Sequence, residues 1–192
     1  MAAPDKEEPR DVFVYDPEVP VLAPEGLQAL AGLTDQATME MGNNLLVYTS
    51  DPAEREMEVV GRPRIMVFAA TSAAHADITA KLVRVTQDER AEFLCIGIAR
   101  SSWLFRDAKY EADAVHKWEF TLEPIAFVLR VGERLRLEIA SSAFPLYDRN
   151  PSTAVPPQSA GPYNWARSTQ QILHTREHPS AVFLPIIGEP AW

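Results

Sequence analysis

The sequence is poor in several residue types, and each shortage argues against a class of protein. A single cysteine, Cys95, excludes an internal disulfide bond, which is compatible with the reducing cytoplasm where we expect the protein to be found. Cys95 lies in the apolar run 92–97, so we predict a buried core thiol. Lysine and arginine number 18 against 27 aspartate and glutamate residues, giving a net charge of −9. A nucleic-acid partner is therefore not expected, since it needs a concentrated basic face.

Long hydrophobic runs are also lacking. No segment approaches the roughly 20 apolar residues of a membrane helix, so no membrane partner is expected. Residues 1–10 have neither the basic start nor the apolar run of a signal peptide. Residues 1–11 are charged and contain proline, which predicts a disordered or loose tail, and residues 12–192 suit a single domain.

The residues of common catalytic motifs are scarce. None of the eight glycines begins the Gly-x-Ser-x-Gly elbow of a serine hydrolase, and we expect Ser141 and Ser142 to bond a neighbouring strand. His174 and His178 are four residues apart, a spacing that suits two metal ligands on a helix. Their surroundings instead predict a strand followed by a turn. We therefore expect no metal site, no cofactor and no catalytic residue in this chain.

Alternating apolar and polar residues indicate strands, which recur every ten to fifteen residues. The candidates are residues 45–49, 56–60, 64–71, 77–86, 91–100, 116–122, 134–142, 169–175 and 181–187. Only 25–33 and 106–114 have a helical pattern, so strands and helices do not alternate regularly. The pattern favours an all-β fold, a two-sheet antiparallel jelly-roll sandwich of the galactose-binding-like type with short helical segments.

Three segments outside the strands are candidates for a binding surface. Asp148-Arg149-Asn150 offers a ligand contact or half of an interface, or else a self-satisfied turn in which Arg149 pairs with an acid; we favour the turn. Trp103, Leu104 and Phe105 either plug one end of the sandwich or form an exposed apolar patch. The proline-rich segment 151–165, which contains Tyr163 and Trp165, is predicted to be an ordered loop across a surface.

Several motifs occur together in a family-specific order. They are LVYTS (46–50), VG (60–61), DITAKLV (77–83), GIAR (97–100), GERLRLEI (132–139), SSAFPLYDRN (141–150) and HPS (178–180) with LP (184–185), preceded by YDP (15–17) and DQ (35–36). With these motifs the chain resembles, over about residues 12–187, the C-terminal jelly-roll domain of the X-Pro dipeptidyl-peptidase and cocaine-esterase family of serine hydrolases. It departs from the family pattern at Ala143, where asparagine is expected.

The resemblance implies a role without catalysis. The complete enzymes of this family cleave acyl esters, amides or X-Pro dipeptides without a metal or organic cofactor, and their serine, aspartate and histidine belong to an α/β-hydrolase domain that this chain lacks. The jelly-roll domain packs on that hydrolase domain and lends apolar side chains to the rim of its active site. Transferred to this sequence, the interface or substrate-rim candidates are Trp103, Leu104, Phe105, Tyr147, Asp148, Arg149 and Trp165.

Three functions compete. The first is an accessory domain that helps to shape the substrate site of an α/β-hydrolase domain, joined in cis or acting in trans. The second is a stand-alone jelly-roll module that binds carbohydrate or protein, with Trp103, Trp118 and Trp165 as platforms, although Trp118 alternates in phase with Phe120 and is expected in the core. The third, an enzyme in its own right, lacks a nucleophile elbow. A homo-oligomer is also compatible with the sequence.

Overall fold

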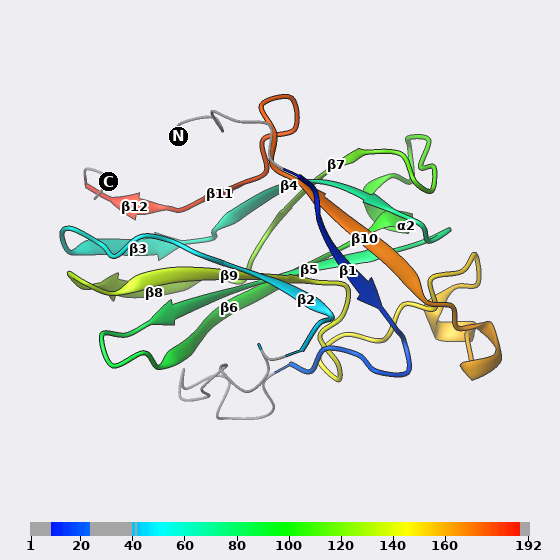
Figure 1. Cartoon of the computed structure of the whole chain (residues 1–192), viewed down its shortest axis with the longest axis horizontal. Coiled ribbons are helices and arrows are strands. Elements are labelled where there is room, and N and C mark those ends of the chain that lie inside the picture. Colours follow the sequence, from blue (N-terminus) through cyan, green and yellow to red (C-terminus); the bar gives the residue numbers. More distant parts are fainter. Residues whose placement is uncertain (1–8, 24–39, 41, 189–192) are drawn as a thin grey trace.

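The computed structural model describes residues 9–23, 40 and 42–188, and these form an all-β fold (Figure 1). Its strands are β1 (Asp11–Tyr15), β2 (Leu45–Thr49), β3 (Met57–Gly61), β4 (Arg64–Thr71), β5 (Asp77–Val85), β6 (Ala91–Arg100), β7 (His116–Thr121), β8 (Ile125–Leu129), β9 (Arg134–Ala140), β10 (Ser168–Leu173), β11 (Ala181–Phe183) and β12 (Ile186–Ile187). The one-turn helix α2 (Ser101–Leu104) and the 3₁₀ turns η1 (Pro157–Ser159) and η2 (Pro162–Asn164) complete it. Within these ranges, no helix has the length and apolarity needed to span a bilayer.

The strands form two layers. One layer is the sheet β2-β9-β5-β6; the other contains β1-β10-β4-β11, with β7 also paired to β4, and the smaller sheet β12-β3-β8. The smaller sheet continues the larger one, because β3 runs into β4, β7 into β8 and β11 into β12. Pro63, Pro124 and Pro185 stand at these three junctions, where the missing N–H interrupts the ladder. The predicted antiparallel sandwich is thus confirmed, with its second layer divided at a row of prolines.

Several local predictions need correction. The strand predicted at 181–187 is divided by Pro185 into β11 and β12, and β8 was not predicted, because its sequence IAFVL has no alternation. The helix predicted at 106–114 was wrong. Asp113 has a φ of 62°, in the left-handed region that a helix excludes, and its N–H bonds to the carbonyl of Thr71. The expectations for residues 1–8 and 25–33 lie outside the described residues.

The core lies between the two layers. Trp118 in β7 is fully buried, as its alternation with Phe120 predicted, and it packs with Ile65 of β4 and Leu82 of β5. The predicted burial of Cys95 is also confirmed, with 2% of the residue exposed. In β3 and β7 the core uses the apolar face that the period-2 pattern assigned, whereas β5 is buried on both faces.

The layers approach each other closely at Gly97 in β6. A Cβ atom there would lie 2.7 Å from the backbone oxygen of Thr121 and 2.9 Å from Cδ2 of Leu122. Because a carbonyl oxygen cannot move aside as a flexible side chain can, the site demands glycine.

We predict that Gly97→Ala lowers the free energy of unfolding by about 1–3 kcal/mol, through overpacking between the layers. Gly161→Ala is the matched control, because nothing lies within 4 Å of its Cβ position and its φ of −116° suits alanine. Urea unfolding of both variants tests this. Equal midpoints for the two variants would contradict the close packing at Gly97.

The Cys95 thiol gives a second test of the core. Burial, aided by the Glu123 carboxylate, raises the pKa of Cys95 from 9.0 to about 12. The folded protein therefore keeps the proton between pH 9 and 12 while the unfolded chain loses it, so this contribution to stability is complete below pH 9 and is lost as the pH rises towards 12. We predict that Ellman's reagent modifies Cys95 at pH 8 only after unfolding; stoichiometric modification of the native protein would contradict its burial.

Candidate functional site

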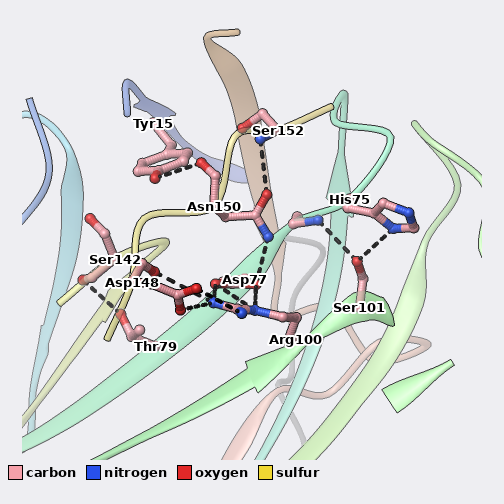
Figure 2. A network of polar contacts seen from close by, with 11 residues as sticks. Tyr15, His75, Asp77, Thr79, Arg100, Ser101, Ser142, Asp148, Asn150 and Ser152 are labelled. Carbon is pink, nitrogen blue, oxygen red and sulfur yellow. Dashed lines mark hydrogen bonds and ion pairs between the residues drawn. The ribbon is translucent and has the colours of Figure 1, made fainter. Parts of the chain in front are cut away.

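One end of the sandwich is organised by a buried ion pair. Asp77 begins β5 and Arg100 ends β6, and the two residues are direct cross-strand partners. The Arg100 guanidinium donates from Nε to Asp77 Oδ1 at 3.0 Å and from Nη2 to Asp77 Oδ2 at 2.8 Å (Figure 2). Asp77 is only 1% exposed, so its charge depends on this bidentate partner. The register of the sheet thus places the pair at the strand ends, beside the loops.

The loop that follows β9 completes the network. Arg100 Nη2 also donates to Asp148 Oδ1 at 2.7 Å, and Asn150 Nδ2 donates to Asp77 Oδ1 at 2.7 Å. Asn150 Oδ1 accepts the N–H of Ser152, and the Asn150 carbonyl accepts the hydroxyl of Tyr15 from β1 (Figure 2). The network therefore joins β1, β5, β6 and the segment 148–152 at one place.

The electrostatics of Asp77 reflect a balance. Burial raises the pKa of its carboxyl above the ordinary value, whereas the hydrogen bonds and charge of Arg100, with the amide of Asn150, lower it. Arg100 has its own pKa raised by hydrogen bonds to Asp77 and Asp148, against the effect of burial, so it stays charged. Each of these side chains is hydrogen-bonded or ion-paired to another member of the network, so the arrangement fixes the loops that carry them.

The prediction for Asp148-Arg149-Asn150 is confirmed in part. Asn150 does bond a backbone N–H, as a self-satisfied turn requires. Asp148, however, pairs with Arg100, and no acid among the described residues pairs with Arg149. In the described part of the chain, the Arg149 guanidinium lies over the rings of Phe144 and Trp165, 4.9 and 4.3 Å from their centroids, and donates to the Pro17 carbonyl. An aromatic sandwich around a cation replaces the expected ion pair.

The predicted alternatives for Trp103, Leu104 and Phe105 both occur. Phe105 points inward and packs against Tyr110, His116 and Trp118. Trp103 is 78% exposed and Leu104 36% exposed, so α2 presents both to solvent. α2 begins directly after Arg100, and the Ser101 N–H bonds to the Ala76 carbonyl. The ion network thus fixes the position of the exposed Trp103.

The segment 151–165 adds further exposed side chains at the same end of the sandwich as α2 (Figure 1). It is an ordered loop, with η1 and η2 inside it, and its start is buried at Pro151 and Ser152. Tyr163 is fully exposed, and Leu146 in the preceding turn is 54% exposed. Leu146 was not predicted as a site residue and Tyr163 only as part of a candidate loop, because exposure is not visible in a sequence without regular alternation. Tyr147 and Trp165 are partly buried.

We call this region the loop end. It consists of the residues of the ion network, of four exposed residues and of three partly buried ones. The exposed residues are Trp103, Leu104, Leu146 and Tyr163, and the partly buried ones are Tyr147, Arg149 and Trp165. It presents large apolar side chains on a fixed polar base. Tryptophan, tyrosine and arginine are the side chains that dominate binding at protein interfaces. The loop end is therefore chemically suited to hold a partner.

Of the two serines expected to bond a neighbouring strand, Ser141 does not, because its buried Oγ has no hydrogen-bond partner among the described residues. The other candidates have structural partners. Ser142 Oγ accepts the Val21 N–H, His174 Nε2 lies 2.9 Å from Asp11 Oδ2, and His178 packs edge-on against Phe68. Among the described residues, no group of three or more His, Cys, Asp or Glu side chains is placed to hold a metal ion.

Comparison with known proteins gives a consistent result. Residues 2–182 match the family model described as the X-Pro dipeptidyl-peptidase C-terminal non-catalytic domain. The chain is 31% identical over 187 residues to the cocaine esterase of Rhodococcus sp. (strain MB1 Bresler), covering 94% of this chain and 33% of that protein.

Solved structures agree. The fold is similar to an aminopeptidase from a marine sediment Thaumarchaeota archaeon, with a TM-score of 0.85, 28% identity and coverage of 97% of this chain and 34% of that one. It is also similar to an α-amino acid ester hydrolase, with a TM-score of 0.81, 25% identity and coverage of 94% and 33%. The chain thus spans about a third of the length of each of these relatives.

The network yields a prediction of stability. Arg100→Leu leaves Asp77 buried without its cation, and we expect a loss of about 3–5 kcal/mol in the free energy of unfolding. Arg106→Leu is the control, because Arg106 is largely exposed and pairs only with its neighbour Asp107 among the described residues; we expect no measurable change there. Chemical denaturation compares them, and a loss below about 1 kcal/mol for Arg100→Leu would show that the pair is dispensable.

Proposed function

The chain belongs to the family of X-Pro dipeptidyl-peptidase C-terminal non-catalytic domains, and we propose that its loop end packs on an α/β-hydrolase domain and helps to shape the substrate site there. The hydrolase is of the dipeptidyl-peptidase or acyl-esterase type, either in the same polypeptide or as a separate subunit. The single observation that carries this proposal is the exposed Trp103 on a base fixed by the Asp77–Arg100 pair.

Exposed apolar surface is costly in water. Trp103, Leu104, Leu146 and Tyr163 lie at the loop end with large exposed areas, and apolar side chains gathered on a rigid surface mark interaction sites. Because the ion network already fixes the backbone under these side chains, less conformational entropy is lost on docking. Both features favour a stable protein–protein contact over a solvent-facing role.

The relatives are compatible with catalysis in one domain and an accessory role in another. Their names describe an esterase, an aminopeptidase and an ester hydrolase, and this chain matches about one third of each. The sequence itself has no Gly-x-Ser-x-Gly elbow. Catalysis by a partner domain, with this chain as its accessory, accounts for both facts.

The alternative of a stand-alone carbohydrate-binding module has less support. Of its three tryptophan platforms, Trp118 is fully buried and Trp165 is partly covered by Arg149. Only Trp103 remains widely exposed. A glycan array is the direct comparison: binding that disappears in Trp165→Ala would support this alternative.

Capture of the tagged chain from its source cells tests the main proposal. We expect a stoichiometric α/β-hydrolase with a Gly-x-Ser-x-Gly elbow, identified by mass spectrometry, or one longer polypeptide that contains both parts. Trp103→Ser should weaken the association by at least roughly tenfold, because an exposed tryptophan in an interface is a typical hot spot.

The control is Val131→Ser, which removes an exposed apolar side chain at the β8–β9 turn, at the opposite end of the sandwich. It should leave the association unchanged, and both variants should keep the unfolding midpoint of the parent. An association that survives Trp103→Ser, or that both variants weaken equally, would contradict docking through the loop end.

A further inference from the structure

A cavity of about 840 Å³ opens between the two layers, at the edge where β2 faces β11. Its lining includes Val47, Tyr48, Thr49 and Ser50 in succession on one side, and Ser180, Ala181 and Val182 in succession on the other. Successive side chains of a strand point to opposite faces. A cavity on one face of a strand would contact only every second residue. Because this cavity is lined by every residue of each run, it lies along the edge of the strand.

Both of these edges are free in the described part of the chain. β2 ends the order β2-β9-β5-β6 and pairs with β9 alone, and β11 ends its own sheet and pairs with β4 alone. Unpaired strand edges present a row of N–H and C=O groups that another strand satisfies. The cavity is thus a slot between two strand edges.

The hydrogen bonding of β2 shows which groups are available. The Ser50 N–H donates to the Leu135 carbonyl at 2.8 Å, and Tyr48 is the partner of Leu137 in the same register. In an antiparallel pair, hydrogen-bonded and non-hydrogen-bonded positions alternate. The N–H and C=O groups of Val47 and Thr49 therefore point away from β9, towards the slot.

The interior of the slot is apolar and its rim is polar. Val67, Leu82 and Ile172 are buried at its wall, whereas Leu137, Val182 and Leu184 are only partly buried.

At the rim, Asp11 Oδ2 accepts the Tyr48 hydroxyl at 2.9 Å and lies 2.9 Å from His174 Nε2. Burial and this bond raise the pKa of Tyr48, so it remains a donor. These contacts hold β1, β2 and β10 together beside the opening.

We propose that the slot receives one extended segment of the hydrolase partner, which pairs with the free edge of β2 and places alternate apolar side chains against Leu137, Val182 and Leu184. Val47 to Ser50 span about 10 Å, enough for four or so residues of a strand. The mode is strand addition, in which backbone bonds supply affinity and the cavity selects side chains. This inference rests on the proposed function, because it names the same partner.

The position of the chain argues for this occupant. Pro9, the first described residue, itself lines the cavity. The matched family is described as a C-terminal non-catalytic domain, and about two thirds of each relative lies outside the match, so these relatives have a large part of their chain upstream of the domain from which such a segment can come. Residues 1–8 of this chain suit the slot poorly, since the sequence MAAPDKEE is half charged and contains a proline without an N–H.

The test uses the full 192-residue chain and overlapping peptides of about a dozen residues that tile the part of the Rhodococcus cocaine esterase upstream of the matched region. We expect one peptide, or two that overlap, to bind and to slow amide hydrogen exchange at Val47 and Thr49. Val47→Pro, which removes an N–H pointing into the slot, should weaken this binding roughly tenfold.

Val47→Thr keeps the N–H and is the matched control, with binding expected within about twofold of the parent. Val182→Arg, which fills the slot from the other edge, gives a second loss that does not depend on β2. Thermal unfolding checks that every variant is folded. The proposal would be overturned if no peptide bound, or if the Val47→Pro and Val182→Arg variants bound it with unchanged affinity. It would also be overturned if deletion of residues 1–8 tightened peptide binding, because those residues would then be the ones that occupy the slot.

Failure of the slot proposal can be distinguished from failure of docking through the loop end. Trp103→Ser should leave peptide binding unchanged, because Trp103 does not line the slot. Capture of a hydrolase without any peptide binding would overturn the slot alone, whereas peptide binding without loss of capture in Trp103→Ser would overturn docking through the loop end alone.

Discussion

The buried carboxylate of Asp77 is the constraint on which the loop end depends. An ionised carboxyl that is 1% exposed is costly unless charge and hydrogen bonds compensate it, and here Arg100 supplies three bonds and Asn150 a fourth. These partners come from separate parts of the chain. Satisfying one buried charge therefore fixes the end of β6, the loop after β9 and, through Tyr15, the strand β1.

This arrangement separates the stiff part of the molecule from its contact surfaces. The sandwich core and the ion network hold backbone positions, while Trp103 and Tyr163 remain in solvent. The slot beside β2 offers a different kind of contact, made by backbone groups at a sheet edge. An accessory domain that held its hydrolase at both places would be fixed in orientation as well as in position, which shaping a substrate site requires.

The sequence predicted the long strands well and the network poorly. Alternation in β7 assigned the correct faces. In β9 the same pattern predicts a solvent-facing polar face, and this was wrong, because Glu138 on that face is 3% exposed and pairs with the buried Lys81 of β5. The Asp148-Arg149-Asn150 motif was recognised, but its partners were not, since Arg100 and Asp77 lie 48 and 73 residues away from the residues they bond. The exposure of Trp103 and the partial burial of Phe105 depend on the short helix α2, which no periodic pattern in the sequence predicts. The slot depends on strand order, which alternation does not encode.

The most direct test of the central claim is amide hydrogen exchange, followed by mass spectrometry, in the parent chain and in Arg100→Leu. If the ion network ties the two exposed segments together, protection will fall jointly at 101–105 and 147–165, while the amides of β4 and β9 stay protected. A loss confined to the immediate neighbours of Arg100, or one spread evenly over all strands, would show that the pair does not organise the loop end.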